Sequence, residues 1–145
     1  MPVLGVKLHR SPVMSVRRTD LRSDRLVYVI VAQRPQRYRY KSSRIVYIGT
    51  TKKGLRRIAV SAAHRADQVL QLRGVREFEV RVVTCQARQN VKTWQKLERA
   101  LLLRFREKHG DVPMCNQQGT RMQERDEFAY FRRERLDAVL SGLEA

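Results

Sequence analysis

The chain has 145 residues, of which 42% are apolar, and this length and composition fit one globular domain and exclude a disordered tail. It carries 31 Lys and Arg against 14 Asp and Glu, a formal net charge of +17 that attracts polyanions and makes nucleic acid the expected partner. No uncharged apolar run approaches the ~18 residues of a membrane span, so we expect no membrane partner and a cytoplasmic location.

The positive charge is uneven along the chain. Residues 1–46 carry eleven basic and two acidic residues, a net charge of +9, and the other 99 residues contribute the remaining +8. Residues 1–24 mix apolar and basic residues without a clear period, so we expect a basic arm with at most a short strand near 3–8. No linker divides residues 25–145, which form the expected domain.

Two strands are predicted at the start of this domain. Segments 25–32 (RLVYVIVA) and 44–49 (RIVYIG) are rich in β-branched and aromatic residues. The segment between them, 33–43, contains Pro35 and little that is apolar, which indicates a loop or a projecting hairpin.

Helices and one further strand follow. Apolar residues recur at helical spacing over 55–73, and Gly74 ends this helix. Alternation predicts a strand over 77–85, and helical patterns cover 91–109 and 122–140. The order β-β-α-β-α-α predicts an α+β fold, with a small three-stranded antiparallel sheet flanked by helices.

The two cysteines, Cys85 and Cys115, are far apart and have no CxxC partner. A disulfide framework or a zinc site needs more ligands at closer spacing. We therefore expect two reduced, buried thiols.

Polar residues on the predicted elements are candidates for chemistry. Tyr28 and Tyr47 lie on the two adjacent strands, although tyrosine is also a favoured strand residue with a purely structural role. One face of the first helix, away from its apolar stripe, carries Arg57, Ser61, His64 and Gln68. A solvated helix face is the alternative explanation for this row.

Glu98 lies within the apolar stripe of the 91–109 helix, which includes Trp94 and Leu101. Burying a carboxylate there costs several kcal/mol unless a cation or hydrogen-bond donors compensate. Glu98 is therefore either half of a structural ion pair or a metal ligand. Mg²⁺ is typically held by one or two protein carboxylates, with water and phosphate oxygens completing its shell.

These residues together resemble a known signature. Val27-Tyr28-Val29 and Tyr47-Ile48-Gly49 are similar to the two halves of the GIY-YIG motif, and Arg57 follows Tyr47 by ten residues. Glu98 comes in a later helix, and Asn116 follows in the loop after it. This ordered set, over roughly 25–119, resembles the GIY-YIG endonuclease family, whose fold has the same β-β-α-β-α-α order.

The chain departs from the family pattern in three places. The first Gly of the motif is Leu26 here, and the segment between the half-motifs is longer than in minimal members. Ser61 stands where many members carry His or Tyr. His64, one further turn along the same face, is the candidate to replace that side chain.

The resemblance implies hydrolysis of DNA phosphodiester bonds, on duplex or branched DNA, with one Mg²⁺ or Mn²⁺ ion bound by Glu98. Arg57 then stabilises the negative charge that develops on the phosphoryl oxygens. Tyr28 or Tyr47 orients or deprotonates the attacking water, with a phenol pKa lowered by nearby cations, or His64 is the base. Asn116 positions the site through hydrogen bonds.

The 33–43 segment is the expected DNA contact. Its cations alternate with aromatic residues, a pattern typical of segments that touch phosphates and bases. It also joins the strands that carry Tyr28 and Tyr47, so we expect it to contact DNA beside the phosphate that is cut. The expected contacts, with two lysines that follow the second strand, are Arg34, Arg37, Tyr38, Arg39, Tyr40, Lys41, Arg44, Lys52 and Lys53. The alternative is a solvated hairpin whose tyrosines pack on the sheet. A basic nucleic-acid-binding protein that keeps the fold without cleavage, or a ribonucleoprotein component, also fits the charge.

Overall fold

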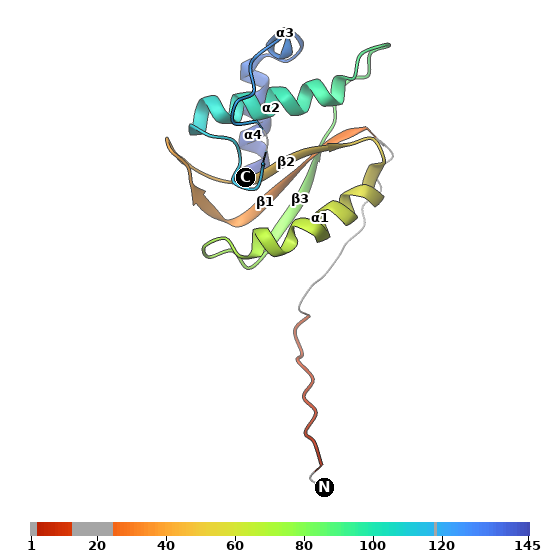
Figure 1. Ribbon diagram of the computed structural model, residues 1–145, viewed down its shortest axis with the longest axis vertical. Coiled ribbons are helices and arrows are strands. Elements are labelled where there is room, and N and C mark those ends of the chain that lie inside the picture. Colours follow the sequence, from red (N-terminus) through yellow and green to blue (C-terminus); the bar gives the residue numbers. More distant parts are fainter. Residues whose placement is uncertain (1–2, 13–24, 118) are drawn as a thin grey trace.

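The computed structural model describes residues 3–12, 25–117 and 119–145. Three strands form an antiparallel sheet in the order β2-β1-β3, with α1 over one face and α2 and α4 over the other (Figure 1). This architecture confirms the predicted α+β class with a three-stranded sheet. In chain order the elements are β1 (Leu26–Arg37), β2 (Ser42–Thr51), α1 (Gly54–Leu70), β3 (Phe78–Val83), α2 (Thr93–His109), α3 (Glu127–Tyr130) and α4 (Arg133–Glu144).

Strand β1 is the centre of the sheet and is buried on both faces from Leu26 to Ala32. Successive side chains of a strand point to opposite faces, so Val27 and Val29 pack in the core beneath α2 and α4. Tyr28 and Ile30 point to the α1 side instead. This double burial explains the nearly continuous apolar run in the sequence.

The segment between the predicted strands is the end of a β-hairpin. Strand β1 continues to Arg37 and β2 begins at Ser42, with a backbone hydrogen bond of 3.2 Å from Tyr38 N–H to the Lys41 carbonyl. The pairing register shifts between Val31 and Gln36, around Pro35, which has no N–H to donate to a ladder. The hairpin alternative is therefore correct, and both strands are longer than predicted.

The first two helices match their predicted positions with small differences at the ends. Helix α1 ends at Leu70. After it, the N–H groups of Leu72 and Val75 donate to carbonyls three residues earlier, as in turns, and not to carbonyls four residues earlier, as in an α-helix. Helix α2 begins at Thr93 and ends at His109, and Gly110, with a φ of +89°, follows it as a left-handed cap.

The single helix predicted over 122–140 is wrong. Phe131 is extended, with φ −131° and ψ 119°, and it separates α3 from α4, which continues to Glu144. The preceding loop is held by α2 arginines, because Arg106 donates to the Gly119, Thr120 and Met122 carbonyls at 2.6–3.1 Å. These carbonyls therefore bind Arg106 and do not accept the backbone hydrogen bonds of a helix. The interruption at Phe131 lets both Phe128 and Phe131 pack on the core.

Residues 3–12 form neither helix nor strand, so the short strand expected near 3–8 is absent. The remainder of the expected basic arm, at 1–2 and 13–24, lies outside the described residues. Both cysteines are free, but only Cys115 is buried and Cys85 is half-buried. Within the described ranges, no helix combines the length and the apolar character needed to cross a membrane.

A candidate active site at the edge of strand β2

The two motif tyrosines are adjacent on the α1 face of the sheet. Tyr28 is paired in register with Gly49, and the Tyr28 and Tyr47 rings have centroids 5.7 Å apart at a tilt of 41°. Gly49 makes room for both rings, because a Cβ there would lie 2.7 Å from Tyr47 Cε1 and 3.0 Å from Tyr28 Cζ. The glycine of the second half-motif is thus a steric requirement of the tyrosine pair.

Helix α1 presents polar side chains to these rings. The Ser61 hydroxyl is hydrogen-bonded to the Tyr28 hydroxyl at 2.5 Å. One turn later, the Arg65 guanidinium lies 3.9 Å from the centroid of the Tyr47 ring and donates to the Cys115 carbonyl at 3.0 Å. Arg57, exposed, precedes Ser61 by one turn and lies at the border of the same face.

The predicted grouping of Arg57, Ser61, His64 and Gln68 on one face needs correction. Helix α1 turns Ile58, Ser61 and Val69 toward the sheet, whereas His64 and Gln68 are exposed. His64 is therefore outside the contact between α1 and the tyrosines, and Ser61 keeps the position on Tyr28.

Sequence reasoning missed Arg65, whose guanidinium lies over the Tyr47 ring. The available signal was its spacing, because Arg57, Ser61 and Arg65 follow one another at four-residue intervals. Residues at this spacing stack on one side of a helix. The arginine-rich composition masked this signal.

Asn116 binds the outer edge of β2. Its Oδ1 accepts from Ile48 N–H at 3.0 Å and its Nδ2 donates to the Ile48 carbonyl at 2.8 Å. Cys115 N–H donates to the Val46 carbonyl at 2.8 Å in the same way. The loop after α2 thereby covers an exposed strand edge and fixes the backbone between Tyr47 and Gly49.

Glu98 approaches the same part of the sheet from α2 and is half-buried. Burial raises the pKa of its carboxyl, against the lowering effects of a hydrogen bond with Thr50 and of the Arg99 charge. Arg99 itself pairs with Glu127 at 2.6 Å. Among the residues that the structure describes, none forms a salt bridge with Glu98, so the structural ion-pair explanation has no partner there.

The donor set around Glu98 is small. The described residues contain no group of three or more His, Cys, Asp or Glu that could hold a metal ion. A site with one carboxylate and the Thr50 hydroxyl beside it suits Mg²⁺, which keeps most of its shell as water and substrate oxygens. It does not suit a metal that requires a full protein cage.

Tyr47 does not have the lowered pKa expected of a general base. Burial, the Tyr28 hydroxyl and the Glu98 charge together raise the pKa of Tyr47 to about 12, and Arg65 only partly offsets them. Tyr47 is therefore a protonated phenol at neutral pH. The Glu98 charge is the weakest of these causes.

The expected DNA contacts of the hairpin divide into two groups. Tyr38 is 6% exposed, packs edge-on against Phe105, and donates its hydroxyl to the Ile45 carbonyl at 2.8 Å, so its ring is not available to a base. Arg44 donates to the Ala32 and Glu144 carbonyls. The remaining side chains are exposed, namely Arg34, Arg37, Arg39, Tyr40 and Lys41.

The hairpin tip does not lie beside the tyrosines, which corrects a second expectation. Tyr40 N–H donates to the His109 carbonyl at the end of α2, eleven residues after Glu98, or about 16 Å along the helix axis. Figure 1 shows the tip and the start of β1, which is the end that carries Tyr28, at opposite ends of the sheet. The exposed Lys52 and Lys53 lie instead at the Tyr28 end, after β2.

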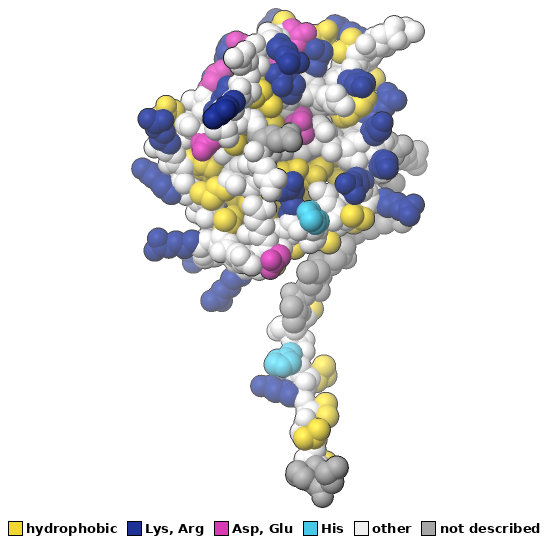
Figure 2. Space-filling model, viewed as in Figure 1, with side chains coloured by type: hydrophobic (Ala, Val, Ile, Leu, Met, Phe, Trp, Pro, Cys, Tyr) yellow, Lys and Arg dark blue, Asp and Glu magenta, His cyan; other side chains and the backbone are white. Residues whose placement is uncertain are grey.

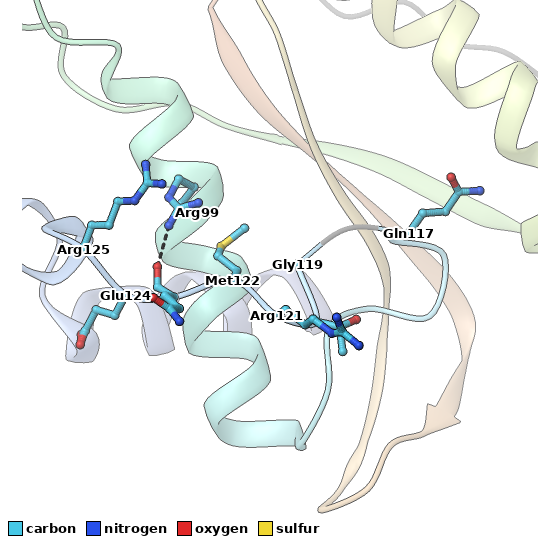
Figure 3. Close-up of a pocket in the computed structure, with 9 residues that line it drawn as sticks. Arg99, Gln117, Gly119, Arg121, Met122, Glu124 and Arg125 are labelled. Atoms are coloured by element: carbon cyan, nitrogen blue, oxygen red, sulfur yellow. Dashed lines mark hydrogen bonds between the residues drawn. The ribbon is translucent and has the colours of Figure 1, made fainter.

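Basic side chains are dispersed over the visible face of the protein, and acidic ones are few (Figure 2). A separate hollow of about 720 Å³ lies between α2 and the loop that follows it, and Arg99, Arg121 and Arg125 contribute to its wall (Figure 3). Arg99 donates to the Gln123 carbonyl there at 2.8 Å. Its lining residues do not include Tyr28, Tyr47 or Glu98.

Comparisons of this chain with protein-family models, with curated proteins and with solved structures found no match.

Proposed function

We propose that this protein is an endonuclease that hydrolyses DNA phosphodiester bonds at the edge of β2 and depends on one divalent metal ion. The observation that carries the proposal is Glu98, a half-buried carboxylate with no salt bridge in the described part of a chain of net charge +17. The ordered resemblance of Tyr28, Tyr47, Arg57, Glu98 and Asn116 to the GIY-YIG signature supports it.

Each side chain has a role in this proposal. Glu98, with the Thr50 hydroxyl beside it, holds one Mg²⁺ or Mn²⁺; the bound ion supplies Lewis-acid stabilisation of the phosphate and of the leaving oxygen. Arg57 donates to the phosphoryl oxygens as their negative charge grows. Tyr47, protonated, orients the attacking water, so the role of base falls to Tyr28, because His64 is exposed away from the tyrosine pair.

The test is cleavage of supercoiled, branched and single-stranded DNA with Mg²⁺, and with EDTA as the metal-free control. Glu98→Gln keeps the shape of the side chain and loses the charge, so we expect no cleavage and nearly unchanged DNA affinity. Glu134→Gln removes an exposed carboxylate from α4 and should cut normally. If Glu98→Gln cuts at the wild-type rate, the metal assignment is wrong.

Thermal melting without metal separates this role from a structural one. A buried ion-pair partner would lose about 3–5 kcal/mol of stability on conversion to Gln. The pKa of Glu98 is raised by burial, so its charged form disfavours folding above the ordinary carboxyl pKa. We therefore expect Glu98→Gln to melt at least as high as the wild type at pH 7, and to lose that advantage near pH 4.

A binding protein without cleavage is the second candidate. It is favoured by Tyr47, whose pKa is raised to about 12, and by His64, which is exposed away from the tyrosine pair. Neither residue is poised as a base. Salt-sensitive DNA binding with no metal-dependent nicking of any of the three substrates would support this candidate against the nuclease.

A further inference from the structure

A hollow of about 420 Å³ opens at the start of α2, within the range of about 300–1,000 Å³ found for small-ligand pockets. Its wall includes Trp94, the only tryptophan of the chain, together with Val91 and Cys85. Arg25 and Arg88 contribute the cations. A pocket with one indole, an apolar wall and two guanidinium groups suits a ligand that is both aromatic and anionic.

Cations already lie over aromatic rings in and beside this pocket. The Arg25 guanidinium carbon is 4.9 Å from the centroid of the Trp94 ring. Arg88 lies 5.4 Å from the centroid of the Tyr130 ring, and Lys96 Nζ lies 4.8 Å from it. Aromatic rings and planar guanidinium groups are the surfaces on which unstacked bases are held, with further cations on the phosphates.

The pocket is one helical turn from the candidate active site. Trp94 precedes Glu98 by four residues on α2, so the two side chains lie on the same side of the helix, about 6 Å apart along its axis. Arg25 precedes Leu26, which pairs with Thr51, the neighbour of Thr50. An axial separation of about 6 Å corresponds to fewer than two nucleotide steps, since stacked nucleotides rise about 3.4 Å each along one strand.

We propose that this pocket binds the base of a nucleotide adjacent to the phosphate that is cut, and that the preferred substrate therefore carries an unpaired or flipped-out base. In an intact duplex, neighbouring base pairs cover both faces of each base, so only an extruded or single-stranded base reaches an indole. The position of the bound base next to the cleaved phosphate rests on the proposed function, whereas the binding of a base in this pocket does not. Branched or single-stranded DNA is preferred over perfect duplex.

The experiment uses the full chain in EDTA, so that binding is measured without cleavage. Trp94 is the sole tryptophan, and its fluorescence reports directly on the pocket. We expect saturable quenching by dAMP and by a single-stranded oligonucleotide, and none by deoxyribose 5-phosphate, which carries the phosphate without the base. Alkylation of Cys85 gives an independent readout, since the same ligands should protect it, and buried Cys115 is the unreactive reference.

Variants then test the stacking directly with a labelled single-stranded oligonucleotide. Trp94→Leu should weaken its binding roughly 5- to 150-fold, the range for loss of one base–aromatic stack, and Trp94→Phe should restore most of it. Arg88→Ala should weaken binding more than Arg135→Ala, which removes an exposed arginine of α4 outside the proposed DNA contacts. Melting of Trp94→Leu checks that it is folded, and Trp94→Phe keeps the test valid if it is not.

The outcomes separate the two proposals. Absence of quenching and of Cys85 protection by dAMP, equal protection by deoxyribose 5-phosphate, or unchanged affinity of folded Trp94→Leu would each overturn the base pocket. Metal-dependent nicking with no base binding leaves the nuclease proposal intact and removes only this inference. Base binding with no cleavage removes the nuclease and leaves the pocket.

Discussion

At the residue scale, substitution of Arg57 tests whether this side chain acts in catalysis or only adds to the electrostatic attraction of DNA. It is exposed on the first turn of α1, one turn before Ser61, which contacts Tyr28. Many other cations attract DNA, so Arg57→Ala should leave affinity nearly unchanged and lower turnover by ~10²–10³, the usual cost of one transition-state donor. Arg56→Ala, also exposed, removes the same charge from the adjacent position and is the matched control. Equal losses of affinity and turnover for both variants would make Arg57 ordinary binding surface.

Gly49 is the second test at this scale. A methyl group there would meet the Tyr47 ring at 2.7 Å and the Tyr28 ring at 3.0 Å, so Gly49→Ala should displace the tyrosine pair. We expect a lower melting temperature and a loss of cleavage at saturating DNA. Gly142→Ala, on α4 with open space around the new methyl, should instead stabilise the protein by about 1 kcal/mol. A wild-type cleavage rate for Gly49→Ala would show that the tyrosine geometry is dispensable.

At the scale of elements, Glu127 fixes α3 and its loop to α2. The side chain is 1% exposed, accepts from Arg99 Nε at 2.6 Å, and accepts from Arg125 N–H at 2.7 Å. Burial opposes its ionisation, but these hydrogen bonds outweigh burial and lower the pKa of Glu127. The α2–α3 contact thus depends on a charged carboxylate.

Glu127→Gln should therefore destabilise the protein by about 3 kcal/mol at pH 7, near the lower end for a broken buried pair, because Arg99 remains partly solvated. A carboxyl with a lowered pKa stabilises the fold above its ordinary pKa, and that contribution is lost as the pH falls. The gap between wild type and variant in chemical denaturation should shrink below about pH 4. A gap that stays constant with pH would mean that packing, and not charge, makes the difference.

At the scale of the whole molecule, the chain has a net charge of +17, and basic side chains are dispersed over the face that Figure 2 shows. Replacing the exposed Arg37, Arg39 and Lys41 of the hairpin by Ala should reduce the salt slope of duplex binding by about 0.9 for each lost phosphate contact. Cleavage at saturating DNA should persist, because the hairpin tip is far from Glu98.

A control with the same loss of charge decides between local contact and general attraction. Arg73, Arg132 and Arg135 are exposed and lie outside the hairpin. Their triple Ala variant should keep the wild-type salt slope if the hairpin touches phosphates. Equal slopes for the two triple variants would assign the effect to the overall field of the protein.

Sequence periodicity predicted a helix or strand correctly where burial of one of its faces determines its structure. The alternation of Phe78, Val80 and Val82 and the apolar stripe of α2 depend only on neighbours in the sequence, and both elements formed as expected. The helix predicted over 122–140 failed, because its hydrogen bonds compete with Arg99 and Arg106, which are distant in sequence. Local pattern carries no information about such partners.

The sequence by itself determined the α+β class, the strand-borne tyrosines and the presence of a carboxylate on an apolar helix face. These follow from the two- and 3.6-residue periods and from composition. Only the tertiary structure decided that Glu98 has no salt bridge within the described ranges, that Arg65 covers Tyr47, and that Tyr38 is core. It also placed Trp94 beside Arg25. Such contacts join residues far apart in the chain, and their distances and burial arise only when the sheet and helices pack together.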